Sequence, residues 1–149
     1  MTAATEDRTA TRKVPPLRYP VVATLTIYKG TMVCLDADGY ATPAADTAGL
    51  SGVVGIAMET RTGGSSSGDT SIRVDSGKAF LVNATSVTQA MLGRMMYVVD
   101  DNVVEEDGGT SVDNHIPAGN MVEFVSTTSC YISIPVGGGT QIRASVKSA

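Results

Sequence analysis

Short segments rich in β-branched and other apolar residues recur along the chain, and turn-forming residues separate them. Several of them alternate between apolar and polar positions, which is typical of half-buried strands. This pattern predicts an all-β fold, either a small antiparallel β-sandwich or a β-barrel, a tulip-like barrel included, and it does not separate these architectures. The predicted strands cover residues 21–28, 31–35, 40–42, 52–58, 70–74, 79–82, 95–99, 103–104, 121–125 and 130–134.

One short helical turn is predicted at residues 88–92, with Ser86 or Thr88 as its N-cap and Gly93 beyond its end. No segment has the length of a helix that crosses over between parallel strands. The strands are therefore expected to pair mainly in antiparallel fashion.

Three parts of different character follow one another. Residues 1–20 are polar and contain Pro15, Pro16 and Pro20, which favour extended backbone, so they predict an extended N-terminal arm. Residues 21–136 hold the predicted strands and form the β-rich domain, in which the Gly/Ser-rich residues 62–68 are expected to be a flexible surface loop. Residues 137–149 begin with three glycines and are expected to form a flexible C-terminal tail.

Charge differs sharply between these parts. The whole chain carries a net charge of −4, but the arm carries +2, the domain −8 and the tail +2. Such an acidic domain repels nucleic acid, so we expect no direct nucleic-acid partner. The basic ends suit contact with acidic protein surfaces, although simple solvated tails fit the charge equally well. No apolar run reaches the roughly 20 residues that span a membrane, and no signal peptide is evident, so no membrane partner is expected.

The two cysteines, Cys34 and Cys130, lie in apolar segments that are predicted strands. We expect both to be reduced core residues, while a disulfide between them stays open. Their separation does not match a metal-ligand spacing.

The sequence offers few residues that could form a catalytic site. Residues 64–68 satisfy the hydrolase pattern G-x-S-x-G around Ser66, but a predicted strand follows where that motif needs a helix. His115 is the sole histidine and is expected to be an exposed turn residue. Asp36 and Asp38, like the acidic residues 100–107, suit turns and solubility better than a calcium loop. We therefore expect no enzyme activity, no cofactor and no metal site.

Four segments of the chain form a recognisable set at characteristic spacing. They are KGTMVCLDADGYATPA (29–44), ADTAG (45–49), GVVGIA (52–57) and TQAMLGRMMYVVDD (88–101). Through them, residues 29–134 resemble the head decoration, or capsid cement, family of tailed bacteriophages. The resemblance implies a β-rich domain on the outer surface of the capsid, binding the major capsid protein, often as a homotrimer, after synthesis in the host cytoplasm.

The arm lies outside this resemblance, and its role is predicted from physics. An arm that is disordered alone can wrap a neighbour and fold on binding, and residues 18–22 are extended enough to add a strand to a neighbour's sheet. A disordered tail without function is the simpler alternative. The expected neighbour-binding residues are Pro15, Pro16, Leu17 and Tyr19 as anchors, with Arg12 and Arg18 as charge partners.

Two rival functions remain open. The first is a carbohydrate-binding or adhesin β-module of a phage tail or host surface, which the lack of Trp disfavours because sugar sites use aromatic platforms. The second is a small hydrolase that uses Ser66 and His115.

Overall fold

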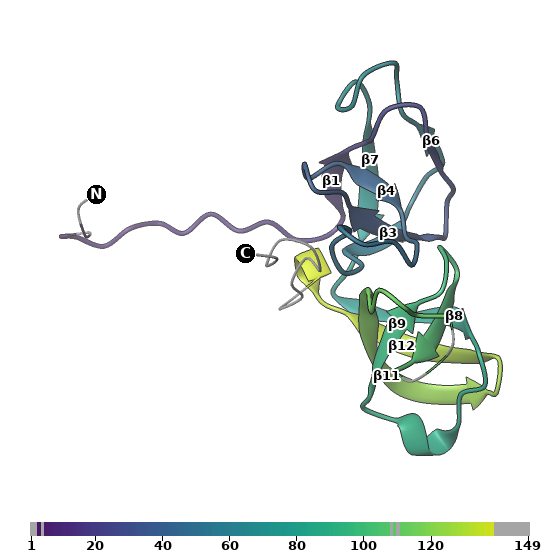
Figure 1. The fold of residues 1–149 in the computed structure, drawn as a ribbon. Coiled ribbons are helices and arrows are strands. Elements are labelled where there is room, and N and C mark those ends of the chain that lie inside the picture. The colour runs from purple at the N-terminus through teal and green to yellow at the C-terminus, as the bar shows by residue number, and fades with distance from the viewer. Residues whose placement is uncertain (1–2, 4, 108, 110, 139–149) are drawn as a thin grey trace.

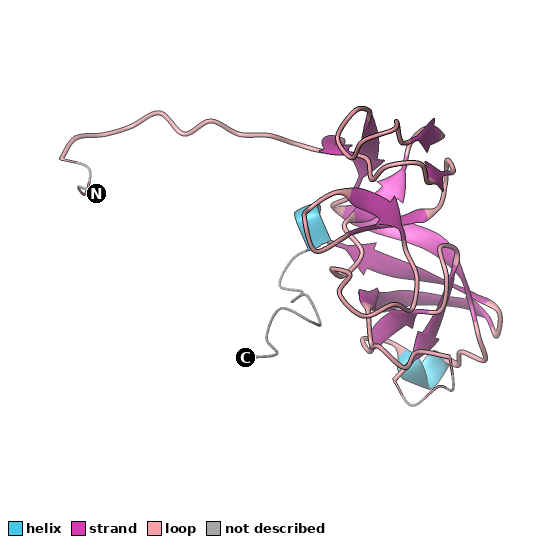
Figure 2. Cartoon of the chain, turned by 45° about the horizontal axis from the view of Figure 1, so that its top comes forward, coloured by secondary structure: helices cyan, strands magenta, loops and turns pink. Residues whose placement is uncertain are grey.

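The computed structural model describes residue 3, residues 5–107, residue 109 and residues 111–138. Twelve strands and two 3-10 helices make up this part of the chain (Figures 1 and 2). In chain order they are β1 (Leu17–Pro20), β2 (Thr26–Ile27), β3 (Met32–Leu35), β4 (Ala41–Pro43), β5 (Gly55–Ala57), β6 (Arg61–Thr62), β7 (Ser71–Asp75), β8 (Lys78–Ala84), η1 (Gln89–Met91), β9 (Met95–Val98), β10 (Val103–Glu106), β11 (Pro117–Ser126), β12 (Ser129–Ile134) and η2 (Val136–Gly138).

The strands form two main sheets that follow one another along the chain (Figure 1). The first is five-stranded in the order β1-β7-β5-β3-β4, and the short pair β2-β6 lies beside it. The second is a closed barrel in the order β10-β8-β12-β11-β9. The all-β prediction is confirmed, and the ladders are antiparallel except for the parallel pairing of β10 with β8.

Barrel closure depends on irregularities in the long strand β11. Its register shifts between Pro117 and Gly119 against β9, and twice more against β12. Such bulges bend a strand and increase its twist, which a small barrel requires. Gly119 is buried at the first shift, where a Cβ atom would lie 2.3 Å from the carbonyl oxygen of Ser133. Only glycine at position 119 allows β11 to approach β12 this closely.

Strand β3 is shared between two hydrophobic cores. Met32 and Cys34 face the barrel core, whereas Val33 faces the core of the first sheet. All three are buried. Successive side chains of a strand point to opposite faces, so a strand buried on both faces is apolar at every position. The two sheets are therefore joined through a common strand.

Both cysteines are free and buried, as expected, and each lies in a strand. Burial raises the pKa of Cys34 to about 12 and also raises that of Cys130. The predicted helical turn is confirmed as η1, but Thr88 makes no side-chain capping bond.

The predicted strand at residues 21–28 is wrong over most of its length. Val21 makes one isolated bridge to Ala41, and the chain then bends through Thr24, whose φ is 66°. Only Thr26–Ile27 are in a strand. Although the chain bends between them, Val21 and Ile27 both lie in the core of the first sheet. The apolar residues of this segment are therefore explained by burial rather than by a continuous strand.

The loop at residues 62–68, expected to be flexible, packs against the body. Gly63 is buried, and its N–H donates to the carbonyl of Leu25. Gly68 N–H donates to the carbonyl of Val21, and Ser67 Oγ accepts from the N–H of Ala23. Thr24 N–H also donates to the carbonyl of Gly64, so four hydrogen bonds tie this loop to residues 21–25.

Of the predicted C-terminal tail, residues 139–149 lie outside the described residues. Gly137 and Gly138 belong to η2, where Gly138 is buried.

Candidate functional site

The N-terminal arm stands away from the body (Figures 1 and 2). Residue 3 and residues 5–14 are exposed, and Val14, an apolar residue, keeps 74% of its surface in contact with solvent. An extended segment of this length spans roughly 30 Å. The described part of the arm therefore offers its side chains outward.

The arm leaves the body beside the turn between β7 and β8. A Cβ atom on Gly77 would lie 3.3 Å from Val136 and 3.7 Å from Pro15. Pro15 is half-buried, whereas Pro16 is exposed. The root of the arm, the Gly77 turn and η2 thus form one corner of the molecule.

The predicted arm extended to residue 20, but its last four residues form β1. Leu17–Pro20 pair with Ser71–Val74 of β7 in antiparallel register. Leu17 and Tyr19 are half-buried, and Tyr19 packs against the core of the first sheet. Two of the four predicted anchors, Leu17 and Tyr19, are thus held by their own domain, because alternation turns both side chains inward. Arg12, Pro16 and Arg18 remain exposed.

The outer edge of β1 is a poor template for another strand. Val21 N–H donates to the carbonyl of Thr70, so by antiparallel alternation the backbone groups of Arg18 and Pro20 point away from β7. Pro20 has no N–H to offer. Proline on an edge strand discourages strand addition. Residues 18–22 already make backbone hydrogen bonds within the chain on one side, and their addition to a neighbour's sheet stays a prediction.

Two arginines contact Glu59, and the charge of a third, Arg18, also acts on it. Arg61 and Arg73 lie 3.2 Å and 3.8 Å from its two carboxylate oxygens. The backbone N–H of Arg73 donates to Glu59 Oε2 over 3.1 Å, and this bond, with the charges of Arg61, Arg73 and Arg18, lowers the pKa of Glu59 against a smaller opposing effect of burial. Sequence reasoning missed Glu59, Arg61 and Arg73. Alternation marks Arg73 as outward-facing, but only the topology brings β1, β6 and β7 together.

The candidate hydrolase residues have separate surroundings. Ser66 lies in the loop after β6, where its N–H donates to Asp69 Oδ2. His115 precedes β11 in the barrel, bonds to Asp107 at 2.9 Å and stacks edge-on against Tyr97. The recorded contacts do not connect Ser66 with His115, and a strand follows Ser66 as predicted.

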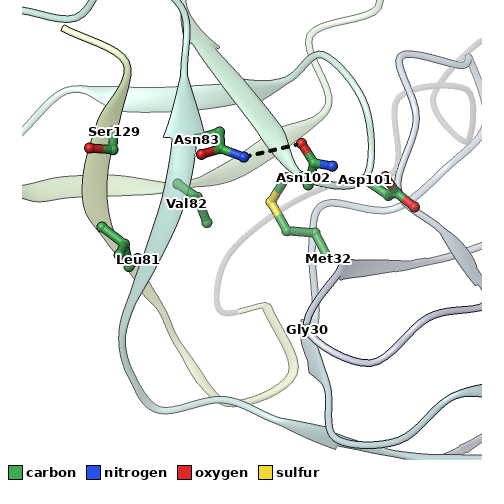
Figure 3. A pocket seen from close by; sticks show the side chains of 8 residues that line it. All are labelled: Gly30, Met32, Leu81, Val82, Asn83, Asp101, Asn102 and Ser129. Atoms are coloured by element: carbon green, nitrogen blue, oxygen red, sulfur yellow. Dashed lines mark hydrogen bonds between the residues drawn. The ribbon is translucent and has the colours of Figure 1, made fainter. Parts of the chain in front are cut away.

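A small cleft of about 180 Å³ lies between β3 and the barrel (Figure 3). Its polar side chains are two amides, one carboxylate and one hydroxyl, and Asn83 Nδ2 donates to Asn102 Oδ1 at 3.5 Å. Burial and the neighbouring charge of Asp100 raise the pKa of Asp101. The cleft is lined by Gly30, Met32, Leu81, Val82, Asn83, Asp101, Asn102 and Ser129. This chemistry suits hydrogen bonding rather than nucleophilic attack.

The acidic residues mostly serve turns. Asp36 Oδ1 accepts from the N–H groups of Asp38 and Tyr40, as the turn interpretation predicts. Glu105, predicted with residues 100–107 to serve turns and solubility, is instead buried in β10 and accepts from the N–H of Ser111. Within the described ranges, no three His, Cys, Asp or Glu side chains gather as a metal site would require.

No family model, curated protein or solved structure matches the chain. Among the described residues, neither helix has the length and apolar character that a membrane span requires.

Proposed function

We propose that this chain is a decoration, or cement, protein of a tailed-phage capsid, which binds the outer surface of the head and stabilises it. The observation that supports this most is the exposed arm of residues 5–14, which extends from a body whose strands are anchored in two cores. A body without a catalytic constellation among its described residues, carrying an outstretched arm, suits a protein that acts by binding.

The energetics suit this role. Ordering a flexible arm costs about 1–2 kcal/mol per residue, so each arm contact alone is weak. A body that docks at the same time makes arm binding intramolecular, which raises overall avidity by about 10²–10⁴. A ligand that binds only the expanded head stabilises that state by mass action.

The resemblance of residues 29–134 to the decoration family supplies the partner. It points to the major capsid protein as the surface bound, and to trimers of this chain as the bound form. The acidic domain, with a net charge of −8 over residues 21–136, agrees with a protein partner rather than packaged DNA.

Binding to heads tests the proposal directly. Purified protein is titrated onto expanded heads of the phage that encodes it, prepared without the protein, and occupancy is measured by quantitative gel analysis and cryo-electron microscopy. We expect saturation at a fixed number of copies per head, and heads that rupture at a higher temperature. Failure to bind expanded heads at micromolar concentration would overturn the proposal.

A matched pair of variants isolates the arm. In one variant, residues 1–14 are deleted; in the other, residues 5–14 are replaced by a Gly/Ser sequence of equal length. Both keep β1 and should fold as the parent does. We expect both to lose at least tenfold in head affinity, because the side chains carry the contact. If only the deletion weakens binding, the arm acts merely as a spacer.

A further inference from the structure

The charge of the basic cluster formed by Arg18, Arg61 and Arg73 is not fully balanced by the residues that the structure describes. Glu59 is the one carboxylate recorded in contact with these arginines among the described residues, so the cluster keeps a net charge of +2. Arg18 itself donates to a neutral group, Ser71 Oγ, at 3.2 Å. The Nε atom of Arg61 is buried and lacks a recorded hydrogen-bond partner.

The fold places two of these charges directly opposite each other. Arg18 and Arg73 are cross-strand partners in the β1–β7 ladder. The bond from Val21 N–H to Thr70 makes their position a non-hydrogen-bonded pair, in which facing Cα atoms lie only about 4.5 Å apart. Like charges at such a position destabilise a sheet. A sheet that keeps this arrangement is better suited to binding an outside anion than to stability alone.

The surroundings favour a carboxylate over nucleic acid. Residues 21–136 hold five basic and thirteen acidic side chains, and two of the five basic ones are Arg61 and Arg73. A phosphate backbone that ran across this body would meet mostly acidic side chains outside the cluster. A guanidinium matches a carboxylate in bidentate geometry, so a protein side chain that reaches this one spot meets no such penalty.

We infer that Arg18, Arg61 and Arg73 form a docking site for carboxylate groups of an acidic protein surface. The identification of that surface as the capsid lattice rests on the proposed function. On the capsid, this site would attach the body to its neighbour close to the root of the arm, because Arg18 lies in β1, the strand from which the arm extends. Body and arm then bind the same neighbour, at two places.

A capsid-independent measurement tests the carboxylate site. Binding of the full chain to a short poly-L-glutamate peptide, which can occupy the cluster without crossing the acidic body, and to a DNA oligonucleotide of equal total charge is measured by fluorescence anisotropy over a range of salt concentrations. Arg18→Ala is compared with Arg94→Ala, which removes the same charge from the barrel, where Arg94 pairs with Glu106. We expect Arg18→Ala to weaken poly-glutamate binding at least about threefold and Arg94→Ala to leave it unchanged.

Two results of this measurement would overturn the inference. Equal effects of the two variants would mean that only net charge matters. Tighter binding of DNA, with the greater loss in Arg18→Ala, would assign the cluster to nucleic acid instead.

Charge reversal separates docking from folding. Arg18→Glu faces Arg73 with an opposite charge but Glu59 with a like one, so the urea midpoint should stay close to that of the parent while poly-glutamate binding is lost. On expanded heads, the same variant should bind at least about tenfold more weakly than the parent and Arg94→Ala. A lowered urea midpoint would show that Arg18 acts through the fold, which would refute the docking role. If the parent fails to bind heads while the poly-glutamate results hold, the proposed function falls and the carboxylate site stands.

Discussion

Replacing Tyr19 with alanine tests where the arm ends and the domain begins. If residues up to 20 were a free arm, this substitution would leave the folded state unchanged. In the structure, Tyr19 belongs to β1, faces Ile72 of β7 and packs against the core of the first sheet. Burial raises the pKa of its phenol, which agrees with a partly enclosed ring. We therefore expect Tyr19→Ala to destabilise the domain itself.

The magnitude follows from the buried area. A fully buried tyrosine removes about 150–250 Å² from solvent, so a half-buried one removes roughly 100 Å². At about 25 cal/mol per Å², and with the partial compactness of unfolded chains, the loss is about 2 kcal/mol. Because the dependence of the unfolding free energy on urea is about 2 kcal/mol/M for a domain of this size, the midpoint should fall by about 1 M.

The assay is urea denaturation followed by far-ultraviolet circular dichroism. Tyr19→Phe is the matched control, because it keeps the ring and should shift the midpoint by less than about 0.3 M. Arg12→Ala, on the exposed arm, should have no effect. A Tyr19→Ala midpoint equal to that of the parent, at an unchanged slope, would refute the assignment of β1 to the domain.

Three further predictions concern the body. Gly63→Ala should destabilise the body by more than about 2 kcal/mol, because the added Cβ would lie 1.8 Å from the carbonyl oxygen of Val22. Thermal unfolding measures the loss of stability, and an unchanged melting temperature would contradict the packing of the loop. Cys34 and Cys130 should resist a thiol reagent at pH 8 until urea unfolds the chain, since burial raises both thiol pKa values; rapid labelling of the native protein would show that the barrel core opens. Glu59 has its pKa lowered from 4.5 by folding, so the stability that it contributes is present above that pH and is lost as the pH falls below it. Melting curves between about pH 3 and 6 should show a shallower acid loss for Glu59→Gln than for the parent, and parallel curves would count against this role.

Local patterns were enough to locate most strands. The alternation of Cys130, Ile132 and Ile134 with polar neighbours predicts the half-buried strand that the barrel contains. The Asp36 turn follows from chemistry confined to a few residues, since its carboxylate accepts from the N–H groups of Asp38 and Tyr40. Such features depend on contacts between near neighbours in the chain, which a sequence displays directly.

Features that join distant segments were not predictable in the same way. Leu17 and Tyr19 look like part of a polar, proline-rich arm, and only pairing with β7 makes them part of the domain. The Gly/Ser composition around Gly63 suggests a flexible loop, but a close approach to Val22 requires those small residues. In both cases, the contacting segment lies about 40 residues or more away in the sequence, so the local pattern does not identify it.

The candidate docking site depends most on the tertiary structure. By itself, the sequence determined that the chain forms short, mainly antiparallel strands, that its domain is acidic, and that an extended segment precedes it. Only the tertiary structure decided that Arg61 and Arg73 meet at Glu59 with Arg18 beside them, because this requires residues 59–61 to lie against β7, which pairs with β1. Strand periodicity sets which way a side chain points, whereas sheet topology sets which side chains it meets.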